Sequence, residues 1–122
     1  MKNVKLPNNE MNASEISLGC MRISSMTNQE ISTLIHTAMD EGINFFDHAD
    51  VYGDGKSEEK FSAALNMNSS LREKMILQTK CGIRQGSFDF SKEHILQAVD
   101  GSLKRLERTT WMCSCCTARM LW

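Results

Sequence analysis

The feature that most constrains the fold is a strand–helix pattern that repeats about every 30 residues. Apolar strand segments are expected at residues 16–21, 43–46 and 75–79, and an amphipathic helical stretch follows each of them. Strands that alternate with helices pair in parallel through right-handed crossovers. The pattern alone is compatible with an open doubly wound sheet and with part of a (βα)₈ barrel. Because a closed barrel needs about 250 residues, three such units cannot close one.

Helix boundaries can be expected from capping residues. A first helix is expected to begin at Thr27, because Thr27 and Glu30 form the T-x-x-E pattern of a capping box. It should end near Gly42, which suits a left-handed C-terminal cap. Ser57 and Ser91 are the expected N-caps of the second and third helices. Apolar residues recur at helical spacing in all three helices: Ile31, Leu34, Ile35, Ala38 and Met39; Phe61, Ala64 and Leu65; and Ile95, Leu96, Val99, Leu103 and Leu106.

Composition excludes several classes of protein. The chain has 122 residues, of which 41% are hydrophobic and 24% charged, as in one modest globular domain. With 14 Lys and Arg against 15 Asp and Glu, the net charge of −1 gives no case for a nucleic-acid or anionic-membrane partner. No apolar stretch approaches the roughly 20 residues that span a bilayer. The first 15 residues lack the apolar core of a secretory signal, so a cytoplasmic location is expected.

Three polar residues are expected to meet at the carboxyl edge of the sheet. Asp47 ends the second strand, Tyr52 follows five residues later, and Lys80 ends the third strand. An ammonium beside a phenol favours the phenolate, and a neighbouring carboxylate keeps that ammonium charged and oriented. The three residues therefore form a candidate general acid. In the structural alternative, Asp47 caps a turn, Tyr52 covers the core and Lys80 is solvated.

Four motifs, in order, resemble those of the aldo-keto reductases. The segment N-F-F-D-H-A-D-V-Y-G, followed by G-K-S-E-E, resembles the D-x-A-x-x-Y-G-x-S-E signature of that family. L-Q-T-K-C-G-I resembles its lysine strand, L-G-C-M-R its first barrel strand and cofactor loop, and H-I-L-Q-A-V-D-G-S-L-K-R-L the helix before its fourth strand. The resemblance covers about residues 14–106 and implies the first three βα units of a (βα)₈ barrel.

This resemblance implies a reductase that transfers a hydride from NADPH to an aldehyde or ketone, which would be its small-molecule partner. Tyr52 would be the general acid, Lys80 would favour its ionisation, and Asp47 would pair with Lys80 and approach the nicotinamide ribose. Gly19, Cys20, Met21 and Asp47 would contact the cofactor, although Ser17 stands where many members have a glycine. His48 and Asp50 would flank the pocket; the alternative for both is a solvated loop position.

The resemblance stops after Leu106. Residues 107–122 show no strand pattern, although the family has a fourth strand here that ends in a catalytic histidine. Three of the five cysteines, Cys113, Cys115 and Cys116, lie in this tail. A metal site usually needs a second pair of ligands, and the sequence offers none, so no metal is expected.

The genetic code offers an explanation for the tail. Read one nucleotide earlier, with permitted wobble bases, the tail encodes G-T-D-Y-V-D-V-L-L-L-H-R-P-D-A-L, which resembles the family's fourth strand. The histidine codon would straddle Cys116 and Thr117. The sequence therefore predicts a barrel fragment at 1–106 and an out-of-frame tail without a domain at 107–122.

Such a fragment is expected to be inactive and poorly folded, because three barrel units leave an open strand edge and uncovered helix faces. The alternative is a small α/β binding module without catalytic activity, which should unfold cooperatively. The physiological substrate, the preference for NADPH over NADH and the oligomeric state stay open.

Overall fold

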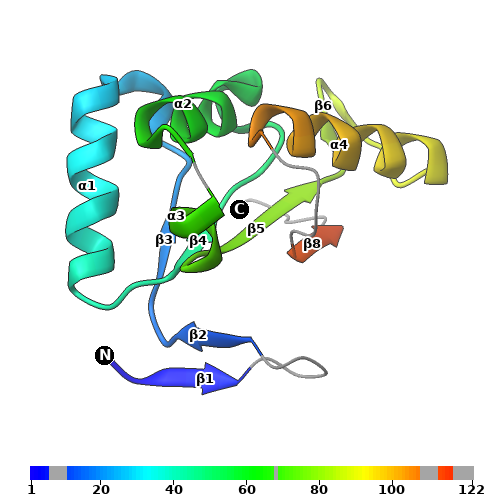
Figure 1. The fold of residues 1–122 in the computed structure, drawn as a ribbon. Coiled ribbons are helices and arrows are strands. Elements are labelled where there is room, and N and C mark those ends of the chain that lie inside the picture. The colour runs from blue at the N-terminus through cyan, green and yellow to red at the C-terminus, as the bar shows by residue number, and fades with distance from the viewer. Residues whose placement is uncertain (6–10, 68, 108–112, 117–122) are drawn as a thin grey trace.

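A four-stranded parallel sheet forms the centre of the protein (Figure 1). The computed structural model describes residues 1–5, 11–67, 69–107 and 113–116. In spatial order the strands are β3 (Ser17–Gly19), β4 (Phe45–Asp47), β5 (Ile76–Cys81) and β8 (Cys113–Cys116). The expectation of an α/β fold with parallel strands is confirmed.

Helices connect these strands, as the repeated pattern predicts. They are α1 (Asn28–Asp40), α2 (Lys56–Leu65), the short α3 (Ser69–Glu73) and α4 (Lys92–Arg105). The capping box of α1 is confirmed, because the Thr27 amide donates to the Glu30 carboxylate at 2.7 Å and the Glu30 amide donates to Thr27 Oγ1 at 3.2 Å. Gly42 follows the helix with φ of +89°. Ser91 caps α4 by accepting from the amide of His94 at 3.2 Å.

The prediction that Ser57 caps α2 is wrong. The helix begins at Lys56, and its N-cap is Gly55 with φ of +85°. This left-handed backbone turns the chain directly from the short helix η2 (Tyr52–Gly55) into α2. Ser57 is consequently the second residue of the helix, where it is buried and donates its hydroxyl to the Met21 carbonyl at 3.4 Å.

The hydrophobic core lies between the helices and one face of the sheet. Alternate strand residues Leu18, Phe46 and Leu77 point into it, since successive side chains of a strand lie on opposite faces. The opposite face therefore carries Asp47, and in β5 it carries Gln78 and Lys80. The buried members of the core are Cys20, Ile23, Ile31, Ile35, Ala38, Phe46, Phe61, Leu65, Met75, Leu77 and Leu106.

The apolar stripe of α4 is only partly buried. Leu106 after the helix has no exposed surface, whereas Leu96 is 54% exposed. Two aromatic residues between β5 and α4, Phe88 and Phe90, are also exposed and stack with ring centroids 6.4 Å apart. Within the described part of the chain, this end of the sheet thus keeps apolar surface in contact with solvent.

Two hairpins and one further turn complete the described structure. The strands β1 (Asn3–Lys5) and β2 (Asn12–Ser14) pair antiparallel, as do β6 (Ile83–Arg84) and β7 (Ser87–Phe88). A 3₁₀ turn, η1 (Ile23–Ser25), follows β3. The Asn44 side chain joins the first hairpin to the sheet: it accepts from the Ser14 amide at 2.8 Å and donates to the Asn12 carbonyl at 2.9 Å.

The expectation that the tail has no strand is wrong. The backbone of Cys113–Cys116 forms β8 and pairs in parallel with β5, with Gln78 opposite Cys113 and Cys81 opposite Cys116. The free edge of β5 offers unpaired backbone donors and acceptors, which any extended segment can satisfy without a strong strand pattern of its own. The rest of the expected out-of-frame tail, residues 108–112 and 117–122, lies outside the described residues.

Candidate active site

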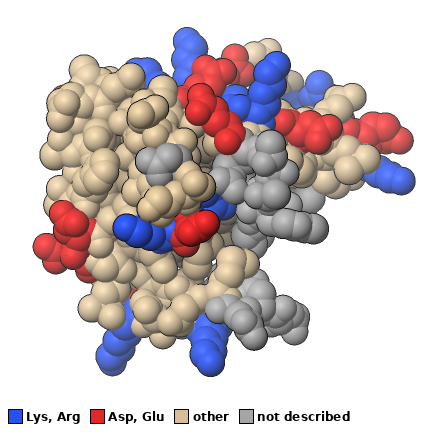
Figure 2. Space-filling view, in the orientation of Figure 1, with Lys and Arg blue, Asp and Glu red and all other residues tan. Residues whose placement is uncertain are grey.

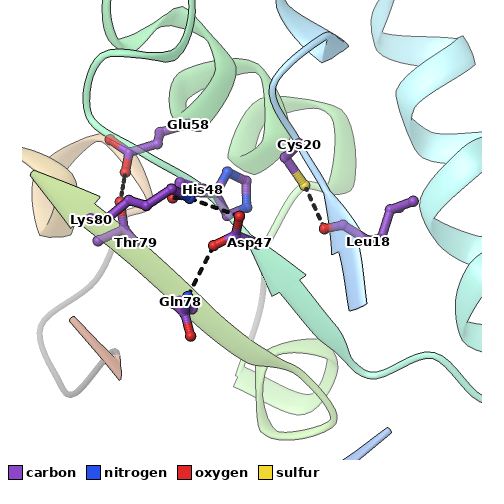
Figure 3. A network of polar contacts seen from close by, with 8 residues as sticks. All are labelled: Leu18, Cys20, Asp47, His48, Glu58, Gln78, Thr79 and Lys80. Carbon is purple, nitrogen blue, oxygen red and sulfur yellow. Dashed lines mark hydrogen bonds and ion pairs between the residues drawn. The ribbon is translucent and has the colours of Figure 1, made fainter. Parts of the chain in front are cut away.

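Asp47 and Lys80 form an ion pair across the two central strands. Lys80 Nζ lies 2.7 Å from Asp47 Oδ2 and donates a second hydrogen bond to the His48 carbonyl at 2.8 Å (Figure 3). Asp47 is the last residue of β4 and Lys80 is the fifth of β5, so parallel pairing brings both to the carboxyl edge of the sheet. Both side chains are partly buried, with 26% and 15% exposed.

Gln78 is a third member of this cluster that sequence reasoning missed. Its amide nitrogen donates to Asp47 Oδ1 at 3.1 Å, so both carboxylate oxygens of Asp47 accept a hydrogen bond (Figure 3). The available signal was strand alternation, because Gln78 and Lys80 are two residues apart and must share a face. Together these contacts fix the orientation of the Asp47 carboxylate.

The structure also brings Tyr52 to this cluster. The Lys80 ammonium lies 4.8 Å from the centroid of the Tyr52 ring, within the range of a cation–π contact. Burial alone would lower the pKa of Lys80, but its interactions with Asp47 and Tyr52 outweigh burial and raise that pKa above its ordinary value. Lys80 is therefore a cation held beside a half-buried phenol.

The loop that holds Tyr52 depends on left-handed backbone. Gly53, Asp54 and Gly55 all have positive φ, with values of +57°, +55° and +85°. At Gly53 the loop also passes close to η1, because an added Cβ would lie 2.6 Å from the Cβ of Ser24. Glycine is thus required at this position by both conformation and space.

The cofactor-loop candidates divide into exposed and buried residues. Gly19 is exposed, an added Cβ there would meet nothing within 4 Å, and Met21 is 54% exposed. Cys20 has no exposed surface, and its amide donates to the Asp47 carbonyl at 2.8 Å. Burial, with a smaller effect of the Asp47 charge, raises the pKa of the Cys20 thiol to about 12. Cys20 is thus an uncharged residue that joins β3 to β4.

Neither His48 nor Asp50 is a solvated loop residue, so that alternative is wrong for both. His48 has no exposed surface and lies edge-on to Phe61, with ring centroids 4.6 Å apart. Asp50 is half-buried, and its Oδ1 has no hydrogen-bonding partner among the described residues. Burial, reinforced by the charge of Glu58, raises the pKa of Asp50. The main chain explains the burial, since the amide of Asp50 donates to the Lys80 carbonyl at 3.1 Å.

A buried polar cluster supports the site from the core side of β5. Glu58 of α2 has no exposed surface and accepts from Thr79 Oγ1 at 2.7 Å, Ser102 Oγ at 3.1 Å and Arg105 Nε at 2.7 Å. Thr79 precedes Lys80 in β5, whereas Ser102 and Arg105 belong to α4. Sequence reasoning missed this cluster, because its members lie far apart in the chain.

The described residues were also compared with what a metal site, a membrane span or a charged binding surface requires. No group of three or more His, Cys, Asp or Glu side chains there could hold a metal ion. The side chains of Cys113, Cys115 and Cys116 lie outside the description. None of the described helices has the length and apolar character needed to cross a membrane. On the face seen in Figure 2, acidic and basic side chains lie among each other.

Comparison with known proteins identifies relatives of this architecture. The profile of the aldo/keto reductase family matches residues 15–111. A Bacillus subtilis protein named uncharacterized oxidoreductase YcsN is 36% identical over an alignment of 109 residues that covers 80% of this chain and 36% of that protein. The 6-dehydroglucose reductase of Novosphingobium aromaticivorans is 38% identical over an alignment of 103 residues that covers 77% of this chain and 34% of that protein. The chain thus spans about a third of the length of these relatives.

Solved structures of aldo-keto reductases also resemble this chain. The holo form of an aldo-keto reductase from Bacillus halodurans superimposes with a TM-score of 0.74 at 32% identity, over 88% of this chain and 37% of that one. A putative aldo-keto reductase from Pseudomonas aeruginosa gives a TM-score of 0.75 at 33% identity, over 87% of this chain and 42% of that one.

Proposed function

Because this chain belongs to the aldo/keto reductase family, we propose that its sheet edge is the catalytic centre of a carbonyl reductase, of which the chain supplies the N-terminal part. The observation that carries the proposal is the contact of Lys80 with both Asp47 and Tyr52. The intact relative would reduce an aldehyde or ketone to an alcohol.

In this proposal Tyr52 is the general acid. It donates its phenolic proton to the oxygen of the carbonyl substrate as that oxygen gains negative charge. The Lys80 ammonium favours the phenolate that remains after the transfer. Asp47, held by Gln78, keeps Lys80 charged and oriented toward the ring.

The residues around β3 fit a nicotinamide cofactor. The open space beside Gly19 and the exposed position of Met21 leave room for a ligand next to Asp47. These three residues would hold the nicotinamide end of NADPH, and buried Cys20 would fix the loop through its hydrogen bond to Asp47. When bound, NADPH supplies the hydride for the reaction.

We further propose that the chain alone does not catalyse the reaction. After α4 it offers no residue that matches the family's catalytic histidine, and the strands expected to hold the rest of the cofactor follow that position. A one-nucleotide loss near the Leu106 codon would explain the change of sequence. Strand β8, Cys113–Cys116, lies where the alternative frame encodes V-L-L-L.

The decisive experiment restores the missing nucleotide and extends the gene in the new frame. We expect the longer protein to oxidise NADPH in the presence of a generic aldehyde, as followed by the loss of NADPH absorbance. The Tyr52→Phe variant of that protein should lose roughly 10²–10⁴-fold in kcat. A Tyr52→Phe variant with unchanged kcat would show that Tyr52 is not the acid.

The 122-residue chain, assayed in parallel, should give no turnover. A rate comparable to that of the longer protein would refute the proposed inactivity and leave the assignment of Tyr52 to be judged by its own variant. An open frame that fails to continue beyond the tail would argue against the frame change.

A further inference from the structure

The side chain of His48 is the buried polar group that the proposed mechanism leaves unused. The residue has no exposed surface, and its ring lies edge-on to Phe61 of α2. Neither ring nitrogen has a hydrogen-bonding partner within the described residues. Most buried side-chain nitrogens in proteins are paired, so an imidazole in this position requires an explanation.

The main chain of His48, in contrast, belongs to the site. Its carbonyl oxygen accepts from Lys80 Nζ at 2.8 Å, and its amide donates to the Gln78 carbonyl at 2.7 Å. The residue therefore holds both the strand that bears Lys80 and the Lys80 ammonium itself. The same residue thus contacts Phe61 of the core through its ring and Lys80 of the site through its carbonyl oxygen.

We propose that His48 is a positioning residue for Lys80: its neutral, buried ring holds the carbonyl that accepts from Lys80, and protonation of the ring releases this contact and moves Lys80 away from Tyr52. The site would thus disassemble in acid through a group that does not itself touch the substrate. This inference deepens the proposed function and rests on it for its catalytic meaning.

The charged groups that face His48 are already bound to other side chains. They are Asp47 of β4, Glu58 of α2 and Lys80 of β5. Both oxygens of Asp47 already accept from Gln78 and Lys80, and both oxygens of Glu58 accept from the core cluster. Lys80 repels an imidazolium. In its present position the ring donates to none of these groups, and a buried imidazolium without a hydrogen-bonding partner is costly. Protonation therefore favours a ring that leaves its position beside Phe61.

The acid–base properties of the ring agree with this geometry. Burial lowers the pKa of His48 to about 4, and it outweighs the charges of Glu58 and Asp47, which act in the opposite direction. The ring is consequently neutral at physiological pH, and the change is expected well below pH 6.5.

Tyr52 is a convenient reporter, because the chain contains one tyrosine and three histidines. The full 122-residue chain would be prepared with ¹³C-labelled tyrosine and ¹⁵N-labelled histidine, and both ring signals followed by NMR from neutral to acidic pH. We expect the Tyr52 ring signals to move with the same midpoint as the His48 nitrogen signals. Midpoints that differ by more than about one pH unit, or a Tyr52 ring in a random-coil environment at neutral pH, would overturn the proposal.

Two variants separate the ring's packing from its charge. His48→Met fills the space without a titratable group, so Tyr52 should keep its neutral-pH signals and lose the acid transition. His48→Ala removes the packing, so Tyr52 should already be displaced at neutral pH. An acid transition of Tyr52 that persists in His48→Met would show that the His48 ring does not cause it.

His36→Gln is the matched control, because His36 is exposed on α1 and is not one of the residues of the Asp47, Lys80 and Tyr52 cluster. It should leave the Tyr52 transition unchanged. If neither His48 variant folds, the two midpoints in the unmodified chain still decide the question. The readout is independent of turnover, so an inactive chain does not affect it.

Discussion

Arg105 Nε lies 2.7 Å from Glu58 Oε2, and this buried ion pair joins α4 to α2 although 47 residues separate the two side chains. Thr79 of β5 donates to the other oxygen of the same carboxylate. The pair therefore connects the two helices to the strand that bears Lys80. Loss of this ion pair should loosen the packing of α2 and α4 against the core side of β5.

Replacing Arg105 by methionine should destabilise the fold by about 3 kcal/mol, because it leaves the Glu58 carboxylate buried without its cation. Urea unfolding at neutral pH measures this change. Arg84→Met is the control: Arg84 pairs with Asp89 at 3.0 Å, but its side chain is 56% exposed. Exposed pairs contribute about 0–1 kcal/mol, so equal losses in the two variants would contradict the structural role of Glu58.

The capping box of α1 gives a second stability prediction. Thr27→Ala removes the oxygen that accepts from the Glu30 amide and should cost about 1 kcal/mol. Thr33→Ala, on the exposed part of the same helix, changes the same atoms outside a cap and should be within about 0.5 kcal/mol of the unmodified chain. Unfolding by urea would distinguish the two. A loss in Thr33→Ala as large as that in Thr27→Ala would rule out a specific capping effect.

Alanine substitutions at two glycines distinguish backbone strain from steric crowding. Gly53 lies in the Tyr52 loop, and Gly86 lies in the turn between β6 and β7. Gly53 and Gly86 both have positive φ, at +57° and +71°, but only at Gly53 would a Cβ meet another atom, 2.6 Å away on Ser24. Gly86→Ala should therefore cost about 1 kcal/mol from strain alone, and Gly53→Ala should cost more and shift the Tyr52 NMR signals. Equal effects at both positions would indicate that the contact with Ser24 is unimportant.

Features that depend on neighbouring residues could be predicted from the sequence. The Thr27 and Glu30 cap, the strand segments and the meeting of Asp47 with Lys80 follow from periodicity and from the rule that parallel strands end at one edge. Features that depend on long-range packing could not. The sequence suggested solvated positions for His48 and Asp50, but main-chain bonds to β5 draw both residues inward.

In the tail, too, tertiary packing decided the structure, and here it produced a strand that local sequence signals did not predict. Cys113–Cys116 has little strand character of its own, and its strand depends on the edge that β5 offers. Likewise the start of α2 was misplaced because a left-handed Gly55, rather than a serine side chain, precedes the helix. Local signals describe what a segment favours, and tertiary neighbours decide which of these preferences is realised.

The stability of the fold should fall in acid because of His48. Burial lowers the pKa of its ring from 6.5 to about 4 in the folded state. The unfolded chain therefore binds more protons between these values, and the free energy of unfolding should decrease as the pH falls from about 6.5 to about 4, by roughly 3 kcal/mol at most. The carboxyl group of Asp50 acts with the opposite sign, because its raised pKa favours the folded state at low pH.

Urea unfolding at several pH values between 7 and 4 tests this prediction. The His48→Met variant should lose most of the acid sensitivity over that range, because methionine does not titrate and the other groups are unchanged. His36→Gln should retain it, since the exposed ring of His36 is removed without altering the site. If His48→Met and the unmodified chain lose stability in parallel, the acid sensitivity arises from the carboxylates, and the buried imidazole does not contribute to it.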